Sequence, residues 1–190
     1  MSLDDELSDL LIISLEQAVA APYCGLLLAS AGARVIKVER PEGDFARSYD
    51  NSINGKSAIF AWLNRGKESI SLDLKNKTDK KIFKNMLKKA DVFLSNLTPG
   101  SLEKLELDYK QVKALNPKLI FCEITGYGNS KLAHSKKAYD FLIQAESGLC
   151  SVTGTEKYPS KVGISITDLS TGLTAYSAIL RGIIQRSKTK

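Results

Sequence analysis

The chain has 190 residues, of which 43% are hydrophobic and 25% are charged, a composition typical of a globular protein of about one domain. Its net charge of +6 suits a polyanionic small ligand, while the lack of RNP, zinc-ligand and basic-helix patterns argues against nucleic acid binding. An acidic N-terminus, unlike a signal peptide, and the lack of membrane-length apolar runs predict one cytoplasmic domain over residues 1–190 without a membrane partner.

Cysteine and histidine are sparse. The three cysteines lie within apolar segments without CxxC spacing, and there is one histidine. This pattern predicts free thiols in a reducing compartment and no metal site.

The first forty residues predict a strand, a helix and a second strand. Residues 10–15 form an apolar run, Pro22 suits a first helical position, and Gly32 suits a helix end. Residues 34–39 are rich in β-branched side chains. Because the connection is a short helix, the two strands are expected to be parallel neighbours.

The middle of the chain continues this alternation. After a turn at residues 40–44, the stretch up to Asn64 is expected to be irregular. A helix is predicted over 78–90, whose lysines we interpret as a solvated face. Short helical pieces are expected at 102–107 and 109–115, and strands at 69–74, 91–95 and 119–124. The fold class is therefore α/β, an open Rossmann-like parallel sheet with helices on both faces.

The last third of the chain contains the candidate catalytic residue. A helix is predicted over 139–150, a short strand over 162–166, and then a long amphipathic helix. Its apolar face is expected to comprise Leu169, Leu173, Tyr176, Leu180, Ile183 and Ile184. Asp168 would thus lie where a strand meets a helix N-terminus, which favours an anion. Position alone leaves two readings, a helix cap or a catalytic carboxylate.

Ligands of open α/β sheets bind beyond the carboxyl ends of the strands. Small, cationic, amide and carboxylate residues are expected to gather there, namely Val19, Ala20, Ala21, Arg40, Asn96, Thr125, Gly126, Tyr127 and Asp168. Neither GxGxxG nor a P-loop motif is present, so a standard dinucleotide or nucleoside triphosphate site is unsupported.

A series of different short motifs lies along the chain in a definite order. The first half contains AAP at 20–22, GARVIKVERP at 32–41, GD at 43–44, LNRGK at 63–67 and ISLD at 70–73. The second half contains DVFLSNLTPG at 91–100, ITGYG at 124–128, YDFLIQA at 139–145, SG at 147–148 and DLSTG at 168–172. Together they resemble the N-terminal part of the class III coenzyme A transferase (CaiB/BaiF) family, which includes formyl-CoA transferase and α-methylacyl-CoA racemase.

The resemblance implies a mechanism. Members of this family move coenzyme A from an acyl-CoA to a carboxylic acid, and Asp168 matches their nucleophile. It would attack the thioester to give an aspartyl anhydride and then an enzyme thioester, which divides a difficult step in two. We expect this carboxylate to be exposed and ionised. With the resemblance, catalysis becomes the preferred reading of Asp168.

The resemblance also implies contacts to coenzyme A, which is expected as a substrate, with no metal. The positions that match cofactor-contacting segments are Val19, Ala20, Arg40, Asn64, Lys67, Asn96, Leu97, Thr98, Lys104, Lys137, Tyr139 and Asp140. Lysine at 104 replaces a frequent arginine, which keeps the charge but loses bidentate phosphate geometry. From the sequence alone, ordinary solvated charge would be the simpler reading of Arg40 and Lys67.

The chain departs from the family in two ways. The usual Ala-Gly-Pro is AAP at 20–22 here, which could change the approach to the backbone, and the chain is much shorter. Family chains are longer and carry a second domain, so this chain reads as a fragment, a split gene product or a remnant. It is expected to need a complementary C-terminal chain or to form a homodimer, and could be a catalytically incomplete CoA-binding module. The racemase branch is a further alternative, but Tyr139 stands in place of its histidine and His134 does not match. With a pKa near ~10, tyrosine is a poor base at neutral pH.

Overall fold

The computed structural model describes residues 5–128 and 136–189, so His134 lies outside the described residues. Within them, five strands form one parallel sheet in the order β3-β2-β1-β4-β5. The strands are β1 (Leu11–Leu15), β2 (Arg34–Glu39), β3 (Glu68–Ser71), β4 (Val92–Ser95) and β5 (Ile120–Glu123). Neighbouring strands are all parallel. The predicted open α/β sheet is confirmed.

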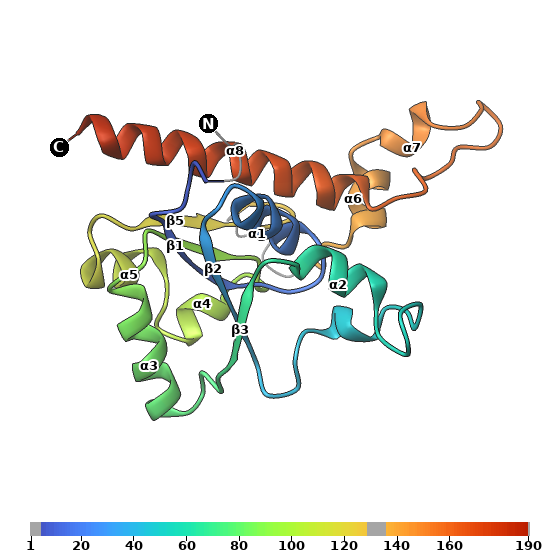
Figure 1. Cartoon of the computed structure of the whole chain (residues 1–190). Coiled ribbons are helices and arrows are strands. Elements are labelled where there is room, and N and C mark those ends of the chain that lie inside the picture. Colours follow the sequence, from blue (N-terminus) through green and yellow to red (C-terminus); the bar gives the residue numbers. More distant parts are fainter. Residues whose placement is uncertain (1–4, 129–135, 190) are drawn as a thin grey trace.

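Helices cover both faces of this sheet (Figure 1). On one face lie α1 (Ala20–Ser30) and the long α8 (Ile166–Lys188), which runs alongside α1. On the other lie α3 (Lys77–Leu87), α4 (Ser101–Lys104) and α5 (Tyr109–Leu115). The remaining helices are η1 (Phe45–Ser48), α2 (Ala58–Asn64), α6 (Asp140–Glu146) and α7 (Leu149–Val152).

The central strand is apolar on both sides because it is covered on both sides. Ile12 and Ile13 are fully buried and point to opposite faces, as successive strand residues do. Ile12 packs into the core that includes Ile179, and Ile13 into the core that includes Phe83. Each buried isoleucine side chain contributes about 1.5–3 kcal/mol relative to exposure, so β1 anchors the two helical layers.

The strand predicted over residues 162–166 is wrong. These residues precede α8 without pairing in the sheet, and the helix already begins at Ile166. Their backbone is held by side chains instead: the Val162 nitrogen donates to Gln144 Oε1 at 2.8 Å. A β-branched run therefore stayed irregular because a buried amide, not a neighbouring strand, satisfies its backbone.

Three further helix predictions need correction. The segment up to Asn64 is not wholly irregular: η1 and α2 lie in it, and Asp44 and Ser57 cap their N-termini. The first helix begins at Ala20, before Pro22. The helix predicted over 139–150 is two, because Gly148 takes a left-handed φ of 82° between α6 and α7.

The buried face of α8 differs in part from the predicted one. Gly172, Ala175 and Ile179 are its buried residues, whereas Leu173 and Ile184 are each 54% exposed. A Cβ atom on Gly172 would lie 2.6 Å from the Ala20 carbonyl oxygen. Small residues therefore face α1 because the two backbones approach closely there.

Candidate active site

The loops at the carboxyl edge of the sheet are fastened to one another. Asn96, directly after β4, accepts a hydrogen bond from the Gln17 nitrogen at 2.9 Å and donates one to the Gln17 oxygen at 2.8 Å. Leu97 packs against the apolar core, and Thr98 is exposed. Asn96 thus uses its amide to position the β1–α1 loop, a role that the sequence did not reveal.

The β1–α1 loop has an unusual backbone. Ala18 takes a positive φ of 64°, and its nitrogen donates to Asp44 Oδ1 at 3.1 Å. Val19 then caps α1 and Ala20 opens it, and both side chains are buried. The approach of a ligand to the backbone of this loop stays a prediction.

A buried ion network lies beneath this loop. Lys67 Nζ contacts Glu16 Oε1 at 2.5 Å, and Lys37 Nζ contacts Asp44 Oδ2 at 2.7 Å and Glu16 Oε1 at 3.6 Å. All four side chains are 2% exposed or less. Burial opposes ionisation of Glu16, but Lys67 and Lys37 lower its pKa below the ordinary value. The network ties β1, β2 and the segment before β3 together.

This network corrects one reading of Lys67. It is not a solvated surface charge, because its ammonium also donates to the Pro22 carbonyl at 2.8 Å and to Asn64 Oδ1 at 3.2 Å. The Asn64 amide nitrogen in turn donates to the Phe60 carbonyl. The three hydrogen bonds of Lys67 are thus made inside the protein, and contact of Lys67 or Asn64 with coenzyme A stays a prediction.

The other predicted cationic contacts lie on the surface. Arg40 follows β2 with its side chain 58% exposed, and its Nε donates to the Gly43 carbonyl at 3.0 Å. Lys104 ends α4, and Lys137 precedes α6; both are exposed. Arg40 is therefore placed at the sheet edge, as predicted, with the rest of its guanidinium free to meet solvent.

Asp168 is the third residue of α8, not a residue at a strand end and not the helix cap. Ser165 stands at the cap position and makes no side-chain capping bond. The helix end is capped instead by Asp140, the first residue of α6. Its Oδ1 accepts hydrogen bonds from the Thr167 nitrogen at 2.8 Å and from the Asp168 nitrogen at 3.3 Å. One carboxylate therefore holds the helix end that carries the other.

The two carboxyl groups differ in their ionisation. Asp168 is half-buried, and desolvation, followed by the nearby charge of Asp140, raises its pKa to about 6. Burial also opposes ionisation of Asp140, but hydrogen bonds from Thr167 and Gln144 lower its pKa. The expectation that Asp168 is exposed is thus wrong, and its carboxylate is more basic than an ordinary aspartate.

Two residues near Asp168 escaped the sequence interpretation. Gln144 is fully buried and donates to Asp140 Oδ2 at 2.6 Å, so it orients the capping carboxylate. For Tyr49, burial and then the charges of Asp44, Asp168 and Tyr139 raise its pKa to about 12. Two predicted site residues, Asp168 and Tyr139, therefore influence the ionisation of Tyr49. Nothing in the local sequence of Tyr49 reveals this.

Among the described residues, no group of three or more His, Cys, Asp or Glu side chains is placed to share a metal ion. No helix within the same residues has the length and apolar character needed to cross a membrane.

The chain resembles known coenzyme A transferases over most of its length. It is 39% identical over 181 residues to succinyl-CoA:glutarate CoA-transferase of Mus musculus, covering 94% of this chain and 42% of that protein. It is 38% identical over 184 residues to acetyl-CoA:oxalate CoA-transferase of Acetobacter aceti, covering 95% of this chain and 47% of the relative.

Solved structures give the same picture. The crystal structure of a CAIB/BAIF family protein from Brucella suis superposes with a TM-score of 0.93 at 36% identity, over 98% of this chain and 51% of that one. The chain therefore spans about half the length of the relatives it matches. Residues 7–190, which include the sheet edge, the Asp140 clamp and Asp168, match the model of CoA-transferase family III, and the chain belongs to that family.

Proposed function

We propose that this chain provides the coenzyme A-binding and nucleophile-bearing part of a CoA-transferase, with Asp168 as the nucleophile. The observation that carries the proposal is the half-buried Asp168 carboxylate, whose pKa is raised to about 6. At neutral pH such a group is about ten-to-one ionised. It is also more basic than an ordinary aspartate, which favours attack on a carbonyl.

The reaction would proceed by two exchanges at Asp168. A carboxylate oxygen of Asp168 attacks the acyl-CoA carbonyl carbon and the C–S bond breaks, so that coenzyme A leaves as a thiolate and a mixed anhydride on Asp168 remains. The thiolate then attacks the Asp168 carbonyl carbon and releases the donor acid as its carboxylate, which leaves an enzyme thioester. The acceptor carboxylate then attacks the enzyme thioester, which releases the thiolate and forms a new mixed anhydride. The thiolate attacks the acceptor's carbonyl carbon to give the product acyl-CoA, and the Asp168 carboxylate is regenerated.

The chain's own residues have separate tasks in this scheme. Asp140 and Gln144 hold the turn that carries Asp168. The β1–α1 loop and Arg40 would meet the nucleotide end of coenzyme A beyond the sheet edge, where open α/β sheets bind ligands. Asn96 would act indirectly, through the backbone of Gln17 that it clamps.

The substrate class is proposed from the relatives. The mouse relative is a succinyl-CoA:glutarate CoA-transferase, and the Acetobacter relative is an acetyl-CoA:oxalate CoA-transferase. Acyl-CoA donors and small dicarboxylic acids as acceptors are therefore the first substrates to test.

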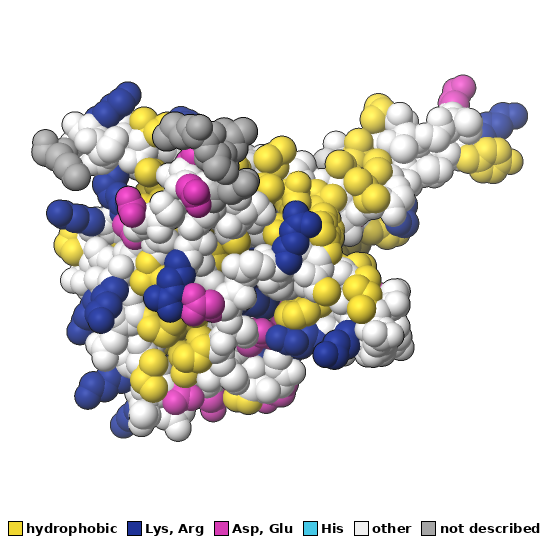
Figure 2. Space-filling view, viewed as in Figure 1, with side chains coloured by type: hydrophobic (Ala, Val, Ile, Leu, Met, Phe, Trp, Pro, Cys, Tyr) yellow, Lys and Arg dark blue, Asp and Glu magenta, His cyan; other side chains and the backbone are white. Residues whose placement is uncertain are grey.

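We also infer that efficient transfer requires a partner, either a second copy or a complementary chain. The segment that contains α7 projects beside α6 (Figure 1), and apolar side chains are exposed near the base and near the tip of this arm (Figure 2). Val152 is 81% exposed and Tyr158 76%. Exposed apolar surface of this kind favours association, and an anhydride open to water would hydrolyse before transfer.

The test is to trap the enzyme thioester. The chain is incubated with succinyl-CoA, treated with hydroxylamine, and digested for mass spectrometry. We expect a hydroxamate on the peptide that contains Asp168, and no modification in Asp168→Asn. The control is Asp73→Asn, which changes an exposed aspartate elsewhere. A hydroxamate that persists in Asp168→Asn would refute the assignment.

A second measurement separates transfer from racemisation. An α-methylacyl-CoA is incubated in heavy water without an acceptor acid. We expect no deuterium at the α-carbon, because tyrosine stands at position 139 where the racemase branch has a histidine. Deuterium incorporation would favour the racemase reaction instead.

A further inference from the structure

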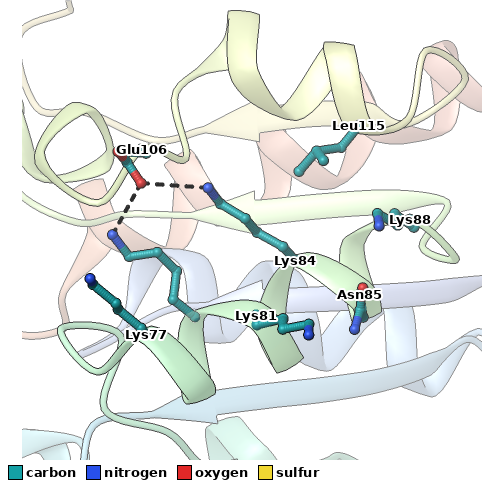
Figure 3. Close-up of a pocket in the computed structure, with 8 residues that line it drawn as sticks. Lys77, Lys81, Lys84, Asn85, Lys88, Glu106 and Leu115 are labelled. Atoms are coloured by element: carbon teal, nitrogen blue, oxygen red, sulfur yellow. Dashed lines mark hydrogen bonds and ion pairs between the residues drawn. The ribbon is translucent and has the colours of Figure 1, made fainter.

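A basic groove lies on the sheet face opposite α8, away from Asp168. It is a hollow of about 530 Å³ between α3 and the residues around α5 (Figure 3). Its charged lining consists of five lysines and one carboxylate, Lys77, Lys80, Lys81, Lys84, Lys88 and Glu106. The lysines thus exceed the carboxylate by four positive charges, and they line one side of this open hollow.

The lysines form a ladder along one helix face. Lys80 and Lys81 are adjacent, but each of the five lysines also has another lysine three or four residues away, about 5–6 Å apart at Cβ. From Lys77 to Lys88 the ladder extends about 16 Å. Like charges at this spacing destabilise a helix, and lysines near its N-terminus also oppose the helix dipole. Asp79 is the only acidic residue of α3, so most of the positive charge of the groove is not compensated within its own helix.

Glu106 supplies one internal counter-charge. Its Oε2 lies 3.3 Å from Lys80 Nζ and 3.6 Å from Lys84 Nζ, as Figure 3 shows. Its backbone has a positive φ of 57°, a conformation that favours glycine. A glutamate at this position directs a carboxylate toward two lysines at some cost in backbone strain. The groove is thus already built to hold one anionic group at Lys80 and Lys84.

We propose that this groove binds a phosphate-rich anion, which displaces the Glu106 carboxylate from Lys80 and Lys84. Lysines attract as point charges and lack the fork that makes arginine selective for single carboxylates. They therefore favour the ligand with the highest charge density, a chain of phosphates. Aromatic side chains are missing from the described lining, and these are the platforms that single-stranded nucleic acid requires.

The groove is independent of the proposed active site. Arg40, Asn96 and Asp168, which belong to that site, do not line it. Binding to the groove can therefore be measured without any turnover, and its failure leaves the assignment of Asp168 untouched.

The experiment measures binding of inorganic tripolyphosphate by calorimetry at low ionic strength. The test variant is Lys80→Gln/Lys84→Gln, which keeps helix propensity and should fold. The matched control is Lys56→Gln/Lys157→Gln, which removes two exposed lysines elsewhere. We expect the test variant to bind about fivefold more weakly and the control to bind like the wild type. Equal weakening in both variants would mean that tripolyphosphate is attracted by the overall positive charge and not by the groove, which would overturn the proposal.

Glu106→Gly provides a test in the opposite direction. It removes the competing carboxylate and places the preferred residue at a positive φ, so the fold should be retained. We expect tripolyphosphate to bind severalfold more tightly, and ATP to respond in parallel because only its phosphates are recognised. Unchanged affinity in Glu106→Gly would contradict the displacement. Binding to phosphatidylserine vesicles without binding to tripolyphosphate would show a lipid surface as the partner and overturn the proposal.

Discussion

Asp140 accepts a hydrogen bond from the backbone nitrogen of Asp168 at 3.3 Å. The same carboxylate therefore fixes the first turn of α8 and raises the pKa of the side chain that this turn presents. Asp140 thus has two effects, a hydrogen bond to the backbone of Asp168 and an electrostatic repulsion of its carboxylate. Substitutions of Asp140 can separate them.

Asp168 should reduce the stability of the fold at neutral pH. Its pKa rises from 3.8 to about 6 on folding, so the native state binds a proton more tightly than the unfolded state. The cost of its charge is then complete above pH 6 and disappears as pH falls below the unfolded value. We expect Asp168→Asn to raise the free energy of unfolding at pH 7 by on the order of 1–2 kcal/mol, after allowance for solvent screening.

Urea unfolding of the wild type and Asp168→Asn at several pH values checks this prediction. The difference between the two proteins should shrink steadily as pH falls from 7 to about 4. A difference that is independent of pH would mean that the substitution acts through packing and not through charge.

Asp140→Asn should lower the pKa of Asp168 without releasing the turn. Asparagine keeps an oxygen acceptor for Thr167 and is itself a good capping residue. It loses the second acceptor, which Gln144 uses, and the charge that disfavours ionisation of Asp168 is gone. We expect the pKa of Asp168 to move from about 6 toward its ordinary value. Only part of the shift should be lost, because desolvation is the larger cause.

Carboxyl-detected NMR titration measures this pKa without relying on turnover. Asp140→Ala is the companion variant, since it removes both charge and acceptor and should also cost about 1 kcal/mol of stability. If Asp168 titrates identically in Asp140→Asn and in the wild type, the electrostatic coupling is absent.

Lys67→Met should strongly destabilise the protein, because it leaves Glu16 as a buried charge with a weaker partner. Lys67 contacts Glu16 at 2.5 Å, whereas Lys37 lies 3.6 Å away. Breaking a buried pair costs about 3–5 kcal/mol, and the remaining Lys37 should keep the loss at or below about 3 kcal/mol. Removing the orphaned charge as well, in Lys67→Met/Glu16→Gln, should restore much of the stability.

Chemical unfolding of both variants measures these losses, with Lys56→Met as an exposed control. If Lys67→Met is as stable as the control, Lys67 is not the buried partner of Glu16. Coenzyme A binding by the double variant then tests, separately, whether Lys67 reaches phosphate.

The sheet was predictable because its strands are short apolar runs separated by clear helical patterns. The predicted strand boundaries at Arg34 and Glu39 agree with β2. The extra strand at 162–166 was not distinguishable, since β-branched composition says nothing of which group satisfies the backbone. That depends on Gln144, which lies 18 residues away from Val162.

The candidate site was predictable in its location but not in its electrostatics. The order of elements places Arg40 and Asn96 at the sheet edge. However, the burial of Lys67 depends on Glu16, which is 51 residues distant, and the pKa of Asp168 depends on burial and on Asp140 from another helix. Charges look alike in a sequence, and only packing decides which are solvated.

Gly172 lies one helical turn after Asp168, and there α8 touches the backbone of Ala20. Ala20 begins the helix that follows the proposed coenzyme A loop. The lack of a side chain at Gly172 allows this close contact. It therefore sets the distance between the nucleophile and the loop that would present the thioester. A single methyl group at position 172 would push the two apart, and the reach of Asp168 would change although no reacting residue had been altered.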